Sequence, residues 1–366
     1  MSVDGLRIGL IGPLPPPEGG MANQTRQLCE LLEREGAKVI TVAVNSPYEP
    51  KWVGRIRGVR ALFRLLPYVS RLWRLAGDVD CFHVMANSGW SWHLFAAPAV
   101  WIATLRGVPT VVNYRGGGAE TFLARSGAIV PRTLQRATAL VVPSGFLQQV
   151  FSRQGLASLI VPNIIDADHF FPAERAERPA QPHLVVARNL EAIYDIGTAL
   201  RAFTIVHASI PSARLTVAGE GPDRKSLTLL AAELGVAEAV NFCGRLDRTQ
   251  MAALYRSASV AVNPSRVDNM PNSVLEAMAS GVPVVSTGVG GVPFIVRDGV
   301  TGLLVPEGDH RSMARAIRTL LDDTAAAERL REAALVDVQQ YTWPRVRQQW
   351  AAVYEAAVSA RRVQYA

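Results

Sequence analysis

Residues 266–305 read RVDNMPNSVLEAMASGVPVVSTGVGGVPFIVRDGVTGLLV, and their pattern decides the fold. Pro271 and Asn272 turn the chain, and Ser273 begins a segment with the apolar spacing of a helix. The apolar runs VPVVST and GLLVP that follow have the length and composition of buried strands. A helix that leads into buried strands indicates a parallel sheet covered by helices.

The same alternation extends outward over the whole chain. In the first half, the apolar runs are LRIGLIG, KVITVAV, CFHVM, PTVVNY and ALVVPS, separated by helical segments such as residues 21–35. In the second half they are HLVVAR, ARLTVAG, AVNFCG, SVAVNP, VPVVST and GLLVP. We therefore expect an α/β protein with two doubly wound, Rossmann-like domains in series.

The two series meet at VPNIIDADHFFP, residues 161–172, where the alternation pauses, and we place a domain boundary near residue 168. A chain of 366 residues is also longer than one compact core requires. Ligands of parallel sheets bind beyond the carboxyl ends of the strands. Functional residues are therefore expected in the loops that lead from strands to helices.

Composition excludes several classes of protein. Cys29, Cys81 and Cys243 are widely spaced and indicate neither a disulfide framework nor a zinc site, which fits a reducing compartment. The start MSVDGLRIGLIG lacks the basic end of a signal peptide. The most apolar window, residues 90–105, is shorter than a membrane span and is expected to be a buried helix.

The net charge of +7 is concentrated in residues 51–74, which hold seven basic residues and no acid. Their spacing predicts a basic amphipathic helix that Pro67 breaks or kinks into two. Such a helix favours an anionic membrane surface, with a plain solvated face as the alternative. No aromatic platform accompanies the charge, so we expect no nucleic-acid partner. The expected membrane-facing residues are Arg57, Arg60, Arg64, Arg71 and Arg74.

Two loops have features of anion sites. Gly19 and Gly20 precede a helix after the first strand, where N–H groups and the helix dipole attract an anion. A plain turn is the alternative, and the motif is not the GxGxxG of dinucleotide sites. AGEGPDRKSL, residues 218–227, is a weaker matching feature in the second half.

The opening stretch is more specific. The N–H groups of residues 272–274, at the start of the helix, are placed to bind a diphosphate. Glu276 lies just beyond them, where an acid accepts the hydroxyls of a ribose. Asp268 would face the part of the ligand that lies beyond the phosphates.

These motifs resemble the retaining, GT-B fold glycosyltransferases of family 4. The resemblance covers nearly the whole chain and rests on the block quoted first, on GG after the first strand, and on VPNIIDADHFFP, ARNLE, AGEGP and FCGRL. It implies two Rossmann-like domains that face a central cleft. Residues 1–168 with a returning C-terminal helix, 343–366, would bind the acceptor, and residues 169–342 the nucleotide sugar.

The resemblance also implies roles for individual residues. Asp268 would hydrogen-bond the hydroxyls of the donor sugar, Arg188 would be a cation on the diphosphate, and Glu276 would bind the ribose. The backbone around residues 244–246 would frame the base. Further donor contacts are implied for Gly19, Gly20, Asn189, Gly219, Gly244, Arg245, Leu246, Asn272, Ser273 and Val274.

Two positions depart from the family pattern in the second half. Asp268 stands where the family usually has Glu, which keeps an acceptor but shortens its reach. A lysine expected after Arg188 is missing, with Tyr194 near its place. The candidates that compensate for the lost cation are Lys225, Arg245 and Arg266.

A third departure lies in NYRGGG, where Arg115 stands at the position of a family histidine. We expect Arg115 to take part in catalysis, either as the missing cation or by pairing with a carboxylate of the sugar or acceptor. His83 matches another family histidine, and a structural role is its stronger interpretation. His83, Tyr114 and Gly116 are weak acceptor-site candidates.

The resemblance implies a metal-independent retaining glycosyltransferase without a cofactor. It would transfer a hexosyl residue from a nucleoside diphosphate sugar, UDP favoured over GDP, to a saccharide or lipid-linked acceptor in bacterial envelope or exopolysaccharide synthesis. Its expected location is the cytoplasm, peripheral on the inner face of the cytoplasmic membrane. Two alternatives stay open: a catalytically impaired nucleotide-sugar-binding partner subunit, and a nucleotide-sugar epimerase on the same fold.

Overall fold

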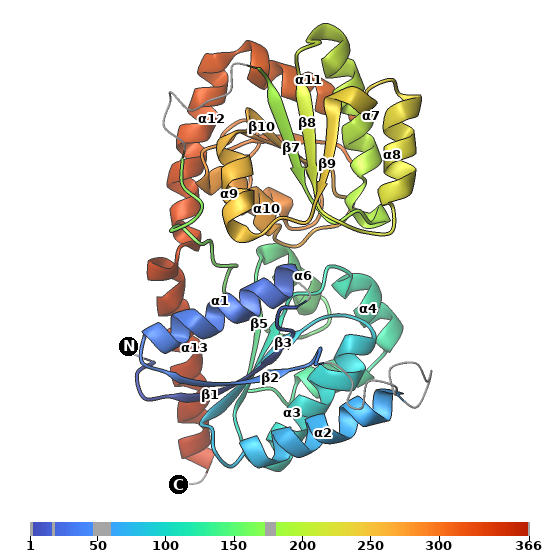
Figure 1. Ribbon diagram of the computed structural model, residues 1–366. Helices are drawn as coiled ribbons and strands as arrows, with labels where there is room; N and C mark the ends of the chain where they lie inside the picture. The colour runs from blue at the N-terminus through green and yellow to red at the C-terminus, as the bar shows by residue number, and fades with distance from the viewer. Residues whose placement is uncertain (1–2, 17–18, 47–59, 173–180, 365–366) are drawn as a thin grey trace. The chain divides into compact units, whose positions relative to one another are not determined.

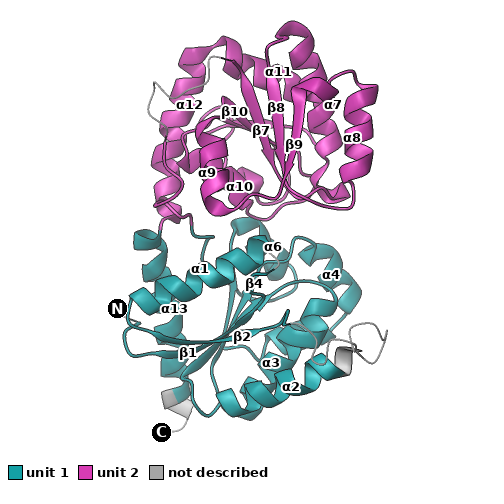
Figure 2. Cartoon of the chain, in the orientation of Figure 1, with its two compact units in different colours: residues 1–164, 343–366 teal, residues 165–342 magenta. Residues whose placement is uncertain are grey.

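The computed structural model describes residues 3–16, 19–46, 60–172 and 181–364, except for the side chains at 60–62 and 362–364. The chain divides into two compact units (Figure 2). Unit 1 is Met1–Ile164 with Trp343–Ala366, and unit 2 is Ile165–Thr342. The boundary expected near residue 168 falls later than this division, because Ile165 and Phe170 both pack in a core of unit 2.

Unit 1 is built on a parallel sheet of six strands in the order β2-β1-β3-β4-β5-β6. Five of these strands are the predicted ones, and the short β6 is not among them. The strands are β1 Arg7–Gly12, β2 Lys38–Ala43, β3 Cys81–Ala86, β4 Thr110–Tyr114, β5 Ala139–Val142 and β6 Leu159–Ile160.

Helices cover both faces of this sheet (Figure 1). One face packs against α1 (Gly20–Arg34) and α13 (Trp343–Gln364), so the last helix belongs to unit 1. The other face packs against α2 Arg60–Leu75, the π-helical turn η2 Trp92–Ala96, α3 Ala97–Leu105, α4 Ala119–Ser126, α5 Ile129–Leu134 and α6 Gly145–Ser152.

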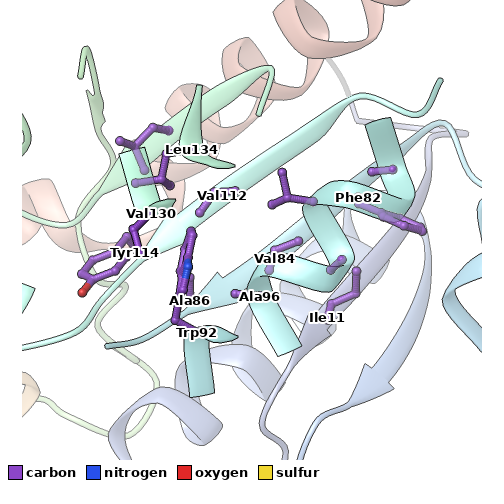
Figure 3. Close-up of a cluster of buried hydrophobic side chains, with 14 of the residues drawn as sticks. Ile11, Phe82, Val84, Ala86, Trp92, Ala96, Val112, Tyr114, Val130 and Leu134 are labelled. Atoms are coloured by element: carbon purple, nitrogen blue, oxygen red, sulfur yellow. The ribbon is translucent and has the colours of Figure 1, made fainter. Parts of the chain in front are cut away.

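The second face carries a large apolar core, shown in Figure 3. Phe82, Val84 and Ala86 alternate along β3 and point to this face, as the two-residue period of a strand requires. Trp92 and Tyr114 are both fully buried, with ring centres 6.3 Å apart. Residues 90–105, predicted to be a buried helix, form η2 followed by α3 and are only partly buried, since Trp90, Trp101 and Leu105 are exposed.

Pro67 does not break the basic helix, so this form of the prediction is wrong. α2 runs without interruption from Arg60 to Leu75 with Pro67 inside it. Pro67 and Phe63, whose carbonyl loses its intrahelical donor, are both exposed, so water can satisfy that carbonyl. No helix in the described part of the chain is long and apolar enough to cross a membrane.

Unit 2 repeats the architecture, with a parallel sheet in the order β12-β11-β10-β7-β8-β9. Its strands, all predicted, are β7 His183–Ala187, β8 Arg214–Ala218, β9 Val240–Gly244, β10 Val260–Asn263, β11 Val284–Thr287 and β12 Leu303–Val305. Its α-helices are α7 Ile196–Ser209, α8 Arg224–Glu233, α9 Arg248–Arg256, α10 Asn272–Ala279, α11 His310–Asp322 and α12 Thr324–Asp337. Its 3-10 turns are η4 Ala192–Tyr194, η5 Ala237–Ala239, η6 Val292–Phe294 and η7 Val338–Tyr341.

The strand order determines where unit 2 can hold a ligand. β7 lies between β8 and β10, so the chain leaves β7 and β10 toward opposite faces of the sheet. A crevice forms at such a switch point, beyond the carboxyl ends of the two strands. The loops after β7 and β10 carry Arg188 and Asp268 respectively.

Candidate functional site

Arg188 lies at the switch point of unit 2, directly after β7. Its Nε donates to Oδ1 of Asn263, at the end of β10, over 2.9 Å. Its Nη2 forms an ion pair with Asp268. The guanidinium carbon lies 5.0 Å from the centre of the Tyr194 ring, within the range of a cation–π contact. These three contacts hold the guanidinium of Arg188 at the carboxyl ends of β7 and β10, where an anionic ligand would bind.

Asp268 is nearly buried, with 12% of its side chain exposed. Burial raises the pKa of its carboxyl, because desolvation disfavours the charged form. The positive charge of Arg188 opposes that rise, as do hydrogen bonds from the backbone of Asn269 and from Ser265. Arg188 is therefore the strongest of the neighbours that favour the ionised form of Asp268.

Two glycines support the loop that carries Asp268. The N–H of Gly291 donates to the carbonyl of Asp268 over 2.8 Å. A Cβ at Gly291 would lie 1.6 Å from the carbonyl oxygen of Asn269, and Gly290 has φ of +53°. No side chain fits here, so the GG of residues 290–291 is required by the loop. These two glycines were not among the predicted site residues, although the motif TGVGGVP places them directly after a predicted strand.

The helix α10 begins immediately after the same loop. Its N-cap is Pro271, which makes no side-chain cap, and its first turn holds no acidic residue. Asn272 and Ser273 are the first two helical positions, as expected for an anion site at this helix start. The expectation for Val274 needs correction, because its N–H donates to the carbonyl of Pro271 over 3.1 Å and its side chain is buried.

Glu276 lies in the second half of α10, and its side chain is half-buried. Burial raises its pKa to about 7, and the charges of Arg188 and Arg248 oppose the rise only partly. Tyr255, fully buried beside it, donates its hydroxyl to the carbonyl of Ser273 over 3.0 Å. Glu276 is thus an acid poised to change charge near neutral pH.

Among the other residues expected at the donor, one glycine is required by the backbone, and three residues keep part of their side chain at the surface. Gly219 is structurally required, since its Cβ would lie 1.9 Å from the carbonyl oxygen of Arg188, and its N–H donates to Gly244 over 2.7 Å. Asn189 and Arg245 are exposed, and Leu246 is half-buried.

The candidates to replace the missing lysine are not equivalent. Arg266 pairs with Asp195 over 3.1 Å, and its N–H donates to the carbonyl of Ile193. Lys225 is exposed on α8. Tyr194 itself, at the position of the lysine, packs on Arg188. The structure therefore places the aromatic ring of Tyr194, rather than a second cation, beside Arg188.

In unit 1, Gly19 and Gly20 lie at the start of α1. Gly19 is the N-cap, with extended backbone, no side-chain cap and no acidic residue in the first turn. A Cβ built on either glycine would meet no atom of the described residues within 4 Å. Within the described residues of unit 1, this helix start therefore leaves room for a ligand to approach the backbone.

Arg115 follows β4 and is held by two asparagines. Its Nε donates to Oδ1 of Asn113 over 3.1 Å, and its Nη1 donates to Oδ1 of Asn163. Burial lowers the pKa of the guanidinium to about 10, which leaves it charged at neutral pH. The two amides orient the guanidinium at the carboxyl end of the sheet.

His83 is not available to an acceptor, because it is completely buried beneath α13. Arginine Nε can only donate, so Asn113 turns its oxygen to Arg115 and its nitrogen to Nε2 of His83, over 3.0 Å. Nε2 must then accept, and the His83 proton sits on Nδ1, 2.7 Å from the hydroxyl of Tyr354. Burial lowers the pKa of His83 to about 3, so the ring is neutral. Its role is structural.

Tyr114 and Gly116 are also buried. The hydroxyl of Tyr114 is 2.7 Å from that of Ser88, and its ring lies in the core with Trp92 and Phe151. A Cβ at Gly116 would lie 2.5 Å from the hydroxyl of Ser88. Both residues therefore shape the loop around Arg115, and Tyr114 presents no surface to an acceptor.

The basic helix is only partly described. Arg57 lies outside the described residues, as does the side chain of Arg60. Arg64 and Arg71 each donate to a backbone carbonyl near β2, over 2.9 and 2.8 Å. Arg74 is exposed. Among the described residues, no cluster of three or more His, Cys, Asp or Glu side chains could hold a metal ion.

Comparison with known proteins follows the same division of the chain. Residues 169–336 match the family model described as glycosyl transferases group 1, and residues 19–163 match that of a glycosyl transferase 4-like domain. The glycogen synthase of Mycobacterium tuberculosis is 31% identical over 282 residues, 74% of this chain and 68% of that protein. The phosphatidyl-myo-inositol mannosyltransferase of Mycobacterium leprae is 28% identical over 384 residues, 99% of this chain and 100% of that protein.

Two solved structures share the fold. Sucrose-phosphate synthase from Thermosynechococcus elongatus has a TM-score of 0.76 at 22% identity, over 97% of this chain and 100% of that one. Anabaena HepE, solved with UDP-glucose, has a TM-score of 0.74 at 17% identity, over 96% and 100%. The chain therefore belongs to the glycosyl transferases group 1 family and is a glycosyltransferase with the GT-B fold.

Proposed function

We propose that this glycosyltransferase moves a hexosyl residue, with retention, from a nucleoside diphosphate sugar to a saccharide or lipid-linked acceptor. The single observation that carries the proposal is the cluster at the switch point of unit 2. There Arg188, Asp268 and the uncapped start of α10 lie together, with Glu276 on the same helix. Asp268 suits the sugar, Arg188 and the helix N-terminus suit the diphosphate, and Glu276 suits the ribose.

Each part has a chemical task. Arg188 and the N–H groups of Asn272 and Ser273 stabilise the negative charge that builds on the departing diphosphate. Asp268 accepts hydrogen bonds from hydroxyls of the donor sugar, and Glu276 accepts them from hydroxyls of the ribose. In this proposal the charge is stabilised without a metal ion.

Asp268 is not proposed as a nucleophile. Its carboxylate is already engaged by Arg188, and a glycosidase-like mechanism needs a second carboxyl acting as an acid. We propose instead that the departing phosphate takes the proton of the acceptor hydroxyl. Catalysis then rests on positioning and on the stabilised leaving group.

Unit 1 is proposed to bind the acceptor. Arg115 offers a fixed guanidinium to it, whereas Gly19 and Gly20 are proposed to offer their N–H groups to the donor phosphates. We propose that Arg115 either binds phosphate oxygens or pairs with a carboxylate of the sugar or acceptor.

The relatives support the choice of donor and acceptor without deciding it. HepE was solved with UDP-glucose, which favours a UDP-sugar over a GDP-sugar. The relative from Mycobacterium leprae is named for a phosphatidyl-inositol acceptor, a lipid. We propose synthesis of a bacterial envelope glycan or exopolysaccharide, by an enzyme that is cytoplasmic and peripheral on the inner face of the membrane.

Donor hydrolysis without acceptor tests the proposal. The full chain is incubated with UDP-sugars and GDP-sugars, and release of nucleoside diphosphate is measured. We expect slow release from a UDP-sugar, lost in Arg188→Met and kept in Arg318→Met, a control at an exposed arginine of the same unit. Binding without turnover, whatever the acceptor, would indicate an impaired partner subunit. Conversion of the sugar without release of nucleoside diphosphate would indicate an epimerase.

A further inference from the structure

One surface of unit 1 exposes large apolar side chains on three helices. On α2 they recur along one face, and they continue on α3 and at the start of α5. We call this surface the tryptophan belt. Its apolar residues are Phe63, Leu66, Trp73, Trp101, Leu105 and Ile129. Their exposed fractions run from 40% at Trp101 to 71% at Leu105, although each residue has the size and apolarity of a core residue.

The belt is continuous across the three helices. α3 packs against both α2 and α5, and Figure 1 shows α2 beside α3. Arg106, next to Leu105, places its guanidinium 5.0 Å from the ring centre of Trp73 and so joins α2 to α3. Arg136 lies 4.1 Å from the ring centre of Trp101 and joins α3 to α5.

Both tryptophans thus carry a cation on the ring. The indole nitrogen of Trp101 also donates to the hydroxyl of Thr133 over 3.3 Å. Beside Trp101, an open hollow of about 580 Å³ is lined by Ile129, Arg132 and Arg136 among others. An apolar ring with a polar tip and a neighbouring cation suits the boundary between lipid headgroups and acyl chains.

The charge of the belt has one sign. α2, α3 and α5 carry no acidic residue. The described basic side chains on or beside them are Arg64, Arg71, Arg74, Arg106, Arg132 and Arg136. Asp78, shortly after α2, is an exposed acid, and Asp80 pairs with Arg7.

We propose that the tryptophan belt docks this enzyme onto an anionic lipid bilayer. The inference deepens the proposed function, since it rests on a membrane-linked acceptor, and it extends the contact from the arginines of α2 to α3 and α5. The apolar side chains enter the headgroup boundary, while the arginines bind lipid phosphates. Charge complementarity favours this occupant over a second copy of the chain, because two like-charged belts would repel each other.

Co-sedimentation with vesicles tests the belt on the full chain. Vesicles contain equal parts of phosphatidylglycerol and phosphatidylcholine, or phosphatidylcholine alone. We expect binding to the anionic vesicles that weakens in high salt. The triple variant Trp101→Gln, Leu105→Gln, Ile129→Gln should lower vesicle partitioning about tenfold or more, because three apolar side chains leave the headgroup boundary. Arg106→Gln with Arg136→Gln should lower it about fivefold for each arginine.

The control is Leu229→Gln with Val336→Gln, which removes two exposed apolar side chains of unit 2 and should leave partitioning unchanged. Thermal unfolding verifies that each variant is folded. The inference is overturned if the folded triple variant binds vesicles like the parent chain, or if a dimer forms without vesicles and the triple variant abolishes it. Donor hydrolysis, measured on the same variants, should be unaffected. Failure of vesicle binding is therefore distinguishable from failure of the proposed reaction.

Discussion

The raised pKa of Glu276 predicts how donor binding depends on pH. Hydroxyls of a ribose donate to a carboxylate, so the proposed contact favours the ionised form. With a pKa of about 7, about one tenth of Glu276 is ionised at pH 6 and about nine tenths at pH 8. Apparent affinity scales with the binding-competent fraction. The dissociation constant for the donor should therefore fall about tenfold from pH 6 to pH 8, or about 1.4 kcal/mol.

Isothermal titration with UDP-glucose measures this directly. UDP-glucose is preferred to UDP, because its two phosphates each keep one negative charge over this range and do not titrate. The matched control is Glu276→Gln, which keeps the shape of the side chain and should bind more weakly at pH 8 but with little dependence on pH. Parent affinity that is constant or falls with rising pH would refute the assignment. An unchanged slope in Glu276→Gln would refute it equally.

The raised pKa of Glu276 also predicts how the free energy of unfolding depends on pH. The folded-state pKa of about 7 lies above the ordinary 4.5, so the folded chain keeps a proton that the unfolded chain loses between these values. The free energy of unfolding contributed by Glu276 therefore falls as pH rises through this window, by about 3 kcal/mol in total. Glu276→Gln should be more stable than the parent at pH 8, with a smaller difference near pH 5, as thermal unfolding would show.

Three further substitutions test the site. Tyr194→Leu should weaken UDP-glucose binding about threefold to thirtyfold in titration calorimetry, because Arg188 loses its aromatic support, whereas Tyr194→Phe should bind like the parent. Equal loss in both would contradict a cation–π role. Arg115→Ala should lower turnover on at least one accepted donor; unchanged turnover on all donors would exclude both proposed roles. Gly291→Ala should destabilise unit 2 by about 3 kcal/mol or more in denaturant unfolding, since its Cβ overlaps the carbonyl of Asn269. A wild-type unfolding curve would contradict that requirement.

Much of the fold could be predicted because buried parallel strands are short apolar runs bounded by turns. Eleven strands were predicted in this way, and all are present. β6 was not predicted, because it is only two residues long and both residues are exposed. The continuity of α2 across Pro67 was not predicted either, because the sequence does not show that the carbonyl of Phe63, which loses its donor, faces water.

The residues of the candidate site could be proposed from the sequence, but the contacts among them could not. Arg188 and Asp268 were each assigned to the donor, yet they lie 80 positions apart and nothing in the sequence shows that they pair. The burial of His83 depends on Tyr354, which lies 271 positions later on α13. Such partners are set by how helices pack on the sheet, which local patterns do not encode.

The central claim is that unit 2 binds a nucleoside diphosphate sugar, and thermal shift with a panel of such sugars tests it most directly. A ligand at a hundred times its dissociation constant adds about 2.7 kcal/mol of stability. For a unit of this size, that raises the melting temperature by roughly 5–10 °C. We predict such a shift with UDP and at least one UDP-sugar, and a smaller one with GDP-sugars. A melting curve that no nucleoside diphosphate or nucleotide sugar moves would contradict the assignment of the site.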